Sequence, residues 1–395
     1  MERTRRQRSR KQPRRSISDI LGIKNIKLNL TKKQLLFFVL IPVAVMLLAL
    51  MIFGAVKLFR KEDTFLKVDF AFDGQIYATS NSIYYIKDNV LYCTDLSGKE
   101  LWSQSYDISS LEIVGSDTFI CVFNEKTAIV TGPNQEKRFT VTPRDYIIKG
   151  AYCGNDVIVF LTETREQEPS TFLRAFDING NELQRFEIAD CELLQYGLSG
   201  KIDNLWTLVL DCTGIEPISR ITVSNPAQNK MTGIIEISDQ LVYRLIMGDN
   251  NMYLMGTNNL VQYNNFNEKL SETLIYGLKC VDSVEIKQNN ATTGVFLFVS
   301  NDIGPGDDIF NVHLMTSQNG KSPSSVLLQL PKGIRDVFLS KDRIICFSDS
   351  SIYLYKHNGE FDTEIRLESR VTDVRKLTDE LILISEEDGV YLYKV

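Results

Sequence analysis

Apolar and polar side chains alternate in short runs from residue 65 to the C-terminus. Val, Ile, Leu, Phe and Tyr recur at alternate positions of these runs, and Asn, Asp and Gly turns separate one run from the next. Alternation with a period of two is typical of half-buried β-strands, whereas an amphipathic helix repeats every 3.6 residues. No helical pattern longer than two turns stands out, so the sequence predicts an all-β domain over residues 65–395.

A larger repeat groups these strands. A strand, a polar turn and a second strand form a unit that begins at residues 90, 127, 172, 218, 260, 311, 351 and 389. Two further apolar runs precede each unit, so about four strands occur in every 43 residues. Four antiparallel strands at this spacing are typical of a propeller blade. The repeat predicts an eight-bladed β-propeller, with a seven-bladed ring as the alternative.

The last repeat is incomplete. The segment "GVYLYKV" at residues 389–395 resembles "SIYLYK" at residues 351–356, but it lacks the second strand that should follow. At the other end of the domain, "FLKVDFAF" at residues 65–72 alternates as a strand does and has no partner of its own. We expect these two segments to pair, because closing the ring removes two exposed strand edges that would invite aggregation.

Residues 35–56, "LLFFVLIPVAVMLLALMIFGAV", carry no charged side chain. A helix of roughly 20 apolar residues is long enough to cross a bilayer. We interpret this segment as a transmembrane helix rather than a cleaved signal peptide, whose apolar region is typically about 7 to 15 residues long. Residues 57–64 then form a short linker. The sequence therefore predicts a single uncleaved membrane anchor before the β-domain.

Charge is divided unevenly around this segment. Residues 1–34 contain 12 Lys and Arg residues against two acids, whereas the chain after Asp63 contains 29 against 46. Only three basic residues, Lys57, Arg60 and Lys61, follow the apolar segment closely. By the positive-inside rule, we expect the basic tail in the cytoplasm and the β-domain on the extracytoplasmic side of the cell membrane.

Two interpretations of the basic tail are open: it binds nucleic acid or a cytosolic partner, or it sets topology by lying on anionic lipid headgroups. We favour the lipid interpretation, since each basic residue near the membrane surface contributes about 1 kcal/mol. The tail lacks the interleaved aromatic residues that stack on bases. The acidic body also argues against nucleic acid as a partner, because phosphate binding requires basic patches.

One repeat resembles a known family. "LYCTDLSGKELW" at residues 91–102 resembles the quinoprotein-type propeller repeat, and "LRAFDINGNELQRF" at residues 173–186 is a weaker echo of it. The resemblance implies a blade geometry in which Gly98 adopts a positive φ and Trp102 packs between blades. A membrane anchor followed by such a propeller also resembles a family of uncharacterised bacterial membrane proteins, and that resemblance implies no activity.

The resemblance does not extend to a dehydrogenase site. Quinone-dependent propeller enzymes resemble one another in recurring Trp motifs and an adjacent-cysteine disulfide, whereas this chain has two Trp residues, Trp102 and Trp206, and no adjacent cysteines. His313 and His357 are its only histidines, and neither a nucleophile elbow nor a zinc-binding helix motif occurs. We therefore predict a protein that is not an enzyme and needs no cofactor or metal.

The best acidic cluster lies in "NDIGPGDD" at residues 301–308, where Asp302, Asp307 and Asp308 surround a Gly-Pro-Gly turn. Carboxylates on a flexible loop suit Ca²⁺, but this spacing differs from that of a calcium-binding loop. We favour a solvated loop over a metal site.

Loop lengths single out one face of the ring. In a propeller, the loops between the second and third strands (B–C loops) and the links between blades emerge on the same face. Three B–C loops are elaborated, in blades three, four and six, while the turns between third and fourth strands (C–D turns) stay short. Long loops on a rigid scaffold often carry binding residues, although insertions are also tolerated where nothing constrains them. The candidate recognition residues are Glu163, Arg165, Glu166, Glu168, Asp211, Glu216, Asp302, Asp307 and Asp308.

These patterns predict a membrane-tethered, extracytoplasmic binding or scaffold module, formed by a monomeric propeller. We expect it to recognise a protein, a peptide or an envelope glycan through the face of the B–C loops. The alternative is an extracytoplasmic hydrolase or lyase that uses carboxylates at the central channel. The scarcity of histidine and the absence of a catalytic motif favour the binding module.

The closing strand also predicts an orientation. It enters the ring as a fourth strand, and a fourth strand begins on the face of the C–D turns. Residues 57–64 span less than about 30 Å even when fully extended. We therefore expect the face of the C–D turns near the bilayer and the face of the B–C loops directed outward.

Overall fold

The computed structural model describes residues 65–200, 202–248, 251–288, 291–318 and 323–395. The predicted basic tail (1–34), transmembrane helix (35–56) and linker (57–64) lie outside the described residues. Within the described ranges, no helix is long and apolar enough to cross a membrane.

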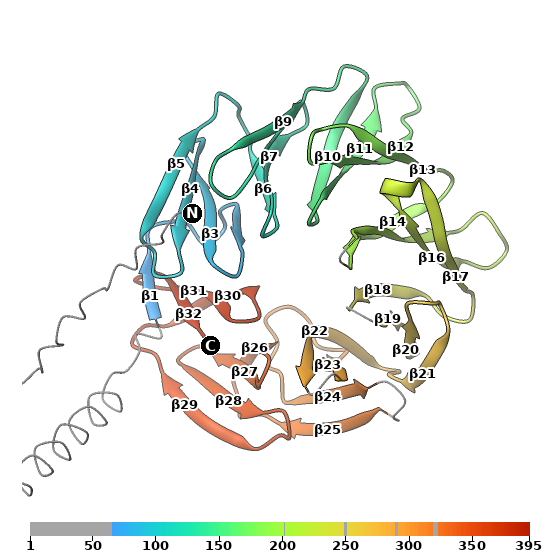
Figure 1. The fold of residues 1–395 in the computed structure, drawn as a ribbon. Helices are drawn as coiled ribbons and strands as arrows, with labels where there is room; N and C mark the ends of the chain where they lie inside the picture. The colour runs from blue at the N-terminus through green and yellow to red at the C-terminus, as the bar shows by residue number, and fades with distance from the viewer. Residues whose placement is uncertain (1–64, 201, 249–250, 289–290, 319–322) are drawn as a thin grey trace, which may run out of the picture. The chain divides into compact units, whose positions relative to one another are not determined.

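The described part of the chain forms eight four-stranded sheets arranged as the blades of a ring (Figure 1). The first strand of a blade lies toward the centre of the ring and the fourth lies at its rim. The predicted all-β, eight-bladed propeller is confirmed, and the seven-bladed alternative is wrong.

Seven blades are built from four consecutive strands. Blades one to four comprise β2 (Ile76–Ala78), β3 (Ser82–Lys87), β4 (Val90–Asp95), β5 (Glu100–Ser105); β6 (Glu112–Gly115), β7 (Ile120–Asn124), β8 (Thr127–Thr131), β9 (Lys137–Val141); β10 (Tyr146–Cys153), β11 (Val157–Thr164), β12 (Thr171–Asp177), β13 (Glu182–Ile188); and β14 (Glu192–Ser199), β15 (Asn204–Asp211), β16 (Ile218–Asn225), β17 (Lys230–Ile237). Blades five to seven comprise β18 (Val242–Met247), β19 (Asn251–Gly256), β20 (Asn259–Asn264), β21 (Lys269–Leu274); β22 (Leu278–Gln288), β23 (Ala291–Ser300), β24 (Asn311–Gln318), β25 (Ser324–Gln329); and β26 (Ile334–Leu339), β27 (Arg343–Ser348), β28 (Ser351–Lys356), β29 (Phe361–Arg366). A single 3-10 turn among the described residues, η1 (Pro226–Gln228), joins β16 to β17.

Blade eight combines both ends of the domain. Its first three strands are β30 (Val371–Thr378), β31 (Leu381–Glu386) and β32 (Gly389–Lys394), and its fourth is β1 (Phe65–Val68). Figure 1 shows β1, in blue, beside the red strands of the C-terminus. The predicted pairing of the first and last segments is confirmed, although β1 covers only the first half of "FLKVDFAF".

Side chains as well as backbone hold this junction together. β1 runs antiparallel to β32, with Leu66 opposite Leu392. The rings of Phe65 and Tyr393 stack with their centroids 5.0 Å apart. Lys67 Nζ donates a hydrogen bond of 2.7 Å to the backbone carbonyl of Asp388. The junction therefore combines strand pairing, apolar contact and a polar bond.

Apolar side chains fill the space between neighbouring blades. The second strands are the most deeply buried; in β7, residues 120–123 are all buried. The junction of blades eight and one is packed in the same way, since Ile76 and Ile83 cluster with Leu381, Leu383 and the closing strand. The eighth interface therefore resembles the others, although its strands come from opposite ends of the chain.

Blade one has the geometry that its repeat motif implies. Gly98 lies in the C–D turn with φ of 79°, a conformation that favours glycine. Trp102 packs against the cluster between blades one and two, and its Nε1 donates to the carbonyl of Pro133 at 3.2 Å. Both expectations for this motif are confirmed.

An ion pair connects three blades through their innermost strands. Asp282 of β22 accepts a hydrogen bond of 2.8 Å from Lys376 Nζ of β30. The same carboxylate accepts one of 2.7 Å from the backbone N–H of Leu339 in β26. The side chains of Lys376 and Asp282 are only 16% and 12% exposed, so an unpaired charge there would be costly. The pair therefore fixes blades six, seven and eight relative to one another.

Deleting residues 389–395 should destabilise the whole propeller, because it removes β32 and leaves β1 without a partner. Each large apolar side chain that loses its burial costs about 1.5–3 kcal/mol. Thermal unfolding followed by circular dichroism checks this, with Lys394→Ala, an exposed residue of the same strand, as the control. A deletion variant with an unchanged Tm would contradict the proposed role of the junction.

Lys376→Met should lower the free energy of unfolding by about 3 kcal/mol, since it leaves the Asp282 carboxylate buried without its cation. Lys356→Met is the matched control, because Lys356 pairs with Glu360 on the surface, where both side chains are more than half exposed. Its effect should stay below about 1 kcal/mol. Urea denaturation measures the free energy of unfolding of both variants. Equal decreases in the two variants would show that the Lys376–Asp282 pair contributes no more than a surface pair.

Candidate functional site

The B–C loops differ in length as the sequence predicts. The loops of blades three, four and six cover residues 165–170, 212–217 and 301–310, whereas the other five B–C connections have two residues each. The C–D turns, which lie between the third and fourth strands of blades one to seven, are four or five residues long. One face of the ring therefore carries all three elaborated loops, and the opposite face carries short turns.

In blade four, Asp211 holds the base of the loop. Its carboxylate accepts a hydrogen bond of 2.6 Å from Thr213 Oγ1 and pairs with Arg220 at 3.0 Å. The Thr213 hydrogen bonds, together with the charge of Arg220, lower the pKa of Asp211. The tip of the loop is exposed and contains Ile215 and Glu216. Asp211 is thus a structural residue, and Glu216 is accessible.

In blade three, the predicted residues divide in the same way. Glu163 pairs with Lys149 of the neighbouring strand at 3.5 Å, and Arg165 Nε donates to the carbonyl of Tyr146 at 3.3 Å. Glu166 and Glu168 lie in the exposed tip. The two residues at the base hold the loop, and the two at the tip are accessible.

In blade six, the aspartates shape the loop that contains them. Asp307 accepts from the backbone N–H of Gly304 at 2.8 Å, and Asp308 accepts from that of Gly333 at 3.2 Å. Asp302 accepts from Ser300 Oγ at 3.4 Å. Among the residues that the structure describes, no group of three or more His, Cys, Asp or Glu side chains is placed to hold a metal ion. The nine predicted residues belong to three blades, where they lie in the B–C loops or at the ends of the strands beside them.

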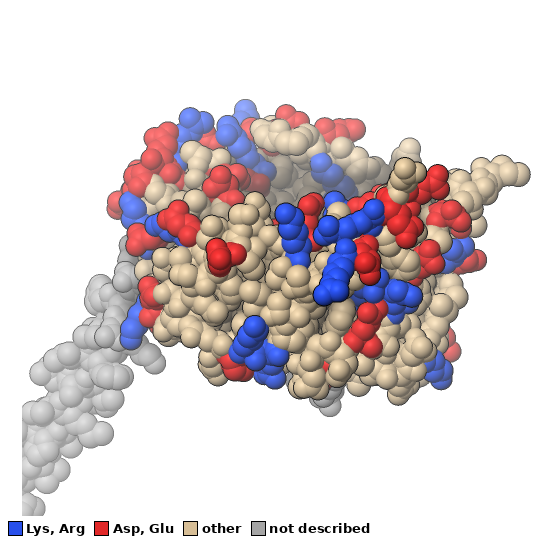
Figure 2. Space-filling model, turned by 90° about the horizontal axis from the view of Figure 1, so that it is seen from above, with Lys and Arg blue, Asp and Glu red and all other residues tan. Residues whose placement is uncertain are grey.

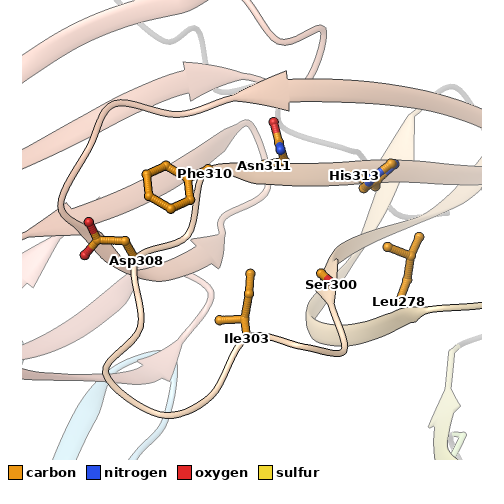
Figure 3. Close-up of a pocket in the computed structure, with 7 residues that line it drawn as sticks. All are labelled: Leu278, Ser300, Ile303, Asp308, Phe310, Asn311 and His313. Atoms are coloured by element: carbon orange, nitrogen blue, oxygen red, sulfur yellow. The ribbon is translucent and has the colours of Figure 1, made fainter.

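Below the blade-six loop, strands β23 and β24 part. Their pairing ends at Phe298 opposite His313, although β23 continues to Ser300 and β24 begins at Asn311. In blades three and four, by contrast, the pairing of the second and third strands continues to the base of the loop. The split contains a pocket of about 390 Å³ (Figure 3). Its lining residues are Leu278, Ser300, Ile303, Asp308, Phe310, Asn311 and His313.

The pocket contains the residue types of a Ser-His-Asp triad without its geometry. The hydroxyl of Ser300 donates to Asp302, and Asp308 bonds to the backbone of Gly333. Figure 3 shows Asp308 on the outer bend of the loop, with its carboxylate directed away from His313. A triad needs the acid to orient the histidine and the histidine to contact the nucleophile. Ser300, Asp308 and His313 therefore do not form a triad in this structure.

Exposed apolar side chains lie on the same face, from blade four to blade six. Two belong to B–C loops, and the other three lie in or beside the links that join blades four, five and six. Single exposed apolar residues are normal, whereas contiguous exposed apolar patches mark interaction surfaces. We call this set the apolar arc; it consists of Ile215, Leu241, Leu274, Tyr276 and Phe310.

The apolar arc and the pocket were missed by reasoning that looked only for charged loop residues. The signal in the sequence was an apolar residue inside an otherwise polar turn, as in "TGIEP" around Ile215 and "IYG" around Tyr276. Such residues have no strand to bury them, so their exposure could have been predicted from their position alone.

The elaborated loops are acidic. Their segments 165–170, 212–217 and 301–310 contain one basic residue, Arg165, against six acids. On the side of the ring drawn in Figure 2, Lys and Arg side chains lie interspersed with Asp and Glu and form no broad basic surface. Binding to the phosphate backbone of a nucleic acid requires basic patches, and these loop segments are acidic. The acids of these segments are Glu166, Glu168, Glu216, Asp302, Asp307 and Asp308.

Two carboxylates lie on innermost strands, which line the central channel. The alternative function, a hydrolase or lyase, would use carboxylates in this position. Asp336 follows a bulge in β26, and Asp373 follows a bulge in β30. Burial raises the pKa of Asp336, and the negative charge of Asp373 raises it further, while Arg335 acts in the opposite direction. Functional acids often have such shifted pKa values, but so do structural ones.

Asp336→Asn should stabilise the propeller in neutral buffer. A carboxyl whose pKa is raised on folding destabilises the folded state once it ionises, so stability falls as the pH rises through the raised pKa. Asn cannot ionise, so the variant should have the higher Tm in neutral buffer and a Tm close to wild type in acid. Scanning calorimetry at both pH values checks this, with the exposed Glu166→Gln as control. A Tm that is unchanged at both pH values would contradict the shift.

Comparison with known proteins gives one family and a group of similar folds. A family model described as a family of unknown function (DUF5711) matches residues 67–390, which cover nearly the whole propeller. No curated protein matched the sequence.

Several solved structures are similar in fold. Sqt1 from Saccharomyces cerevisiae matches with a TM-score of 0.52 at 10% identity, over 83% of this chain and 98% of that one. The dihydro-heme d1 dehydrogenase NirN matches with a TM-score of 0.54 at 10% identity, over 83% of this chain and 72% of that one. BamB from Moraxella catarrhalis matches with a TM-score of 0.49 at 11% identity, over 84% and 100%. These structures share the propeller fold with this chain, but sequence identities this low give no information about its activity.

Proposed function

The chain belongs to the DUF5711 family, whose function is unknown, and we propose that it is a non-catalytic module that binds another protein through the face of its B–C loops. One observation carries the proposal. The apolar arc lies on the same face as the three elaborated loops, and all five of its side chains are exposed.

The arc has the chemistry of the centre of a protein interface. Burying apolar surface contributes about 25 cal/mol per Å². Aromatic residues are enriched at interface centres, and a tyrosine adds a hydroxyl that can bond to the partner. Tyr276 is 77% exposed and Phe310 is 49% exposed, so both have surface left to bury. The acidic loop tips around them would form the polar rim.

We further propose that the module is tethered to a membrane by residues 35–56, with the propeller outside. Phe65 lies opposite Tyr393, near the end of β32, so the chain enters the ring on the face of the C–D turns. A short linker would then keep that face toward the bilayer. The face with the apolar arc would point away from the membrane, where a partner can reach it.

A second candidate is a hydrolase or lyase that uses carboxylates of the innermost strands. The raised pKa of Asp336 next to Asp373 is the observation that favours it. Activity on glycans and esters that is lost in both Asp336→Asn and Asp373→Asn would support this candidate. The binding module is preferred because an exposed apolar surface has no role in such chemistry.

Site-specific photo-crosslinking tests the binding module. A photoreactive phenylalanine replaces Tyr276 in the full-length chain, expressed in its native cell. The matched control carries it at Phe266, which is 83% exposed in the C–D turn of the adjacent blade, on the opposite face. We expect one defined protein adduct from position 276 and none from position 266. The second step is Ile215→Ser with Leu274→Ser, which should reduce the adduct at position 276 at least several-fold.

The proposal is wrong if both positions give the same set of adducts, because the two residues differ in face and hardly in exposure. It is also wrong if the double substitution leaves the adduct at position 276 unchanged.

A further inference from the structure

Resting on the proposed function, we propose that the blade-six pocket receives a large apolar side chain from a positively charged segment of the partner protein. The partner is thus defined by its chemistry: an aromatic or long aliphatic anchor residue flanked by Lys or Arg. The pocket, the parting of β23 from β24 and the charge of the loops each support one part of this description.

The pocket matches an anchor side chain in size and lining. Its volume of about 390 Å³ lies at the lower end of the range for ligand sites. Leu278, Ile303 and Phe310 supply the apolar surface (Figure 3). Residues that fill such desolvated pockets contribute most of the affinity at protein interfaces. Phe310 belongs to the apolar arc as well, so the pocket is one end of that surface.

Polar groups line the other side of the pocket. Ser300 ends β23, while Asn311 and His313 begin β24, and the pairing of the two strands stops at His313. Beyond that point β23 pairs only with β22, and β24 pairs only with β25. A peptide backbone entering with its anchor residue would therefore meet hydroxyl, amide and imidazole groups between the two strands. Such groups fix the orientation of a bound chain, which an apolar pocket alone does not.

The loop that covers the pocket is held at both ends. The backbone N–H of Ile309 donates to the carbonyl of Ile334 at 2.7 Å, and that of Leu330 donates to the carbonyl of Phe310 at 2.8 Å. Ile309 itself is buried among the residues of blades six and seven. At the other end, Lys279 Nζ donates to the carbonyl of Ile303. A pocket preformed in this way binds without the entropic cost of ordering a loop.

The charge of the surroundings selects a basic partner. The three elaborated loop segments contain six acids against Arg165, and three of those acids lie in the blade-six loop itself. Lys279 of β22 is hydrogen-bonded to the loop itself, at the carbonyl of Ile303. Complementary charge speeds association and disfavours partners of the wrong sign. An acidic segment at the pocket would be repelled by the three acids of the blade-six loop.

A panel of short synthetic peptides tests the inference on the full-length chain by fluorescence anisotropy. Each peptide carries Phe, Leu or Ala at its centre, and either Lys or Glu on both sides. We expect the Phe and Leu peptides with Lys flanks to bind at least about tenfold more tightly than the Ala peptide or the Glu-flanked peptides. Added salt should weaken binding of the Lys-flanked peptides, because the loop acids are exposed.

Variants locate the binding. Phe310→Ser should weaken the Lys-flanked Phe peptide about tenfold, and Asp302→Lys should weaken it and reduce its preference over the Glu-flanked peptide. Phe266→Ser is the control for Phe310→Ser, since both remove an exposed phenyl ring from a loop of the ring's surface. Circular dichroism confirms that each variant keeps its fold.

The outcomes separate this inference from the proposed function. Equal binding of Lys-flanked and Glu-flanked peptides overturns the charge selection, and equal binding of the Phe and Ala peptides overturns the anchor. Binding that Phe266→Ser weakens as much as Phe310→Ser also overturns the inference, as does a small molecule that fills the pocket without competing with the peptide. If the adduct at Tyr276 persists while no peptide binds, the protein-binding function stands and the pocket is not its anchor site.

Discussion

The pairing of β1 with β32 is the constraint on which the rest of the ring depends. Seven blades assemble from strands that follow one another, so their pairing is local. The eighth requires residues as distant as Lys67 and Asp388, which are 321 positions apart, to meet. Contacts between positions this far apart carry a large loop-closure entropy, and topologies rich in such contacts fold slowly. Once formed, the pairing of β1 with β32 supplies both the missing strand of blade eight and part of the packing against blade one.

A closed ring gives the loops a rigid base. The blades differ where a B–C loop is longer than the two residues found in five of them. Blades three and four lengthen their second and third strands together, so the added residues continue the pairing. Blade six inserts a longer loop and its strands stop pairing at His313. The pocket is a direct consequence of that interruption. The proposed binding site thus lies at a local interruption of strand pairing in one blade and not in the central channel.

The repeat in the sequence was sufficient to predict the fold. Alternating runs define strands, the regular spacing defines blades, and the missing half of "GVYLYKV" identifies the closing strand. The candidate site was harder to predict. Glu163 and Asp211 lie at the ends of strands β11 and β15, and Asp308 lies in a loop. The bonds that make them structural join them to residues whose positions depend on the fold. The split in blade six depends on strand register, and neither composition nor spacing encodes the register of an individual pair. The sequence shows that Ile215 and Tyr276 are apolar residues in polar turns. That both are exposed on the same face of the ring is known only from the structure.

Hydrogen exchange of the full-length chain, followed by mass spectrometry, tests the closure of the ring most directly. If β1 is an integral fourth strand, the amides of residues 65–68 that bond to β32 should be as protected as the corresponding amides of β29, and they should become exchangeable together with β32 as denaturant is added. The fourth strand of blade seven, β29, is the internal reference for a strand at the rim. Rapid exchange of residues 65–68 while β29 and β32 remain protected would contradict the closed ring.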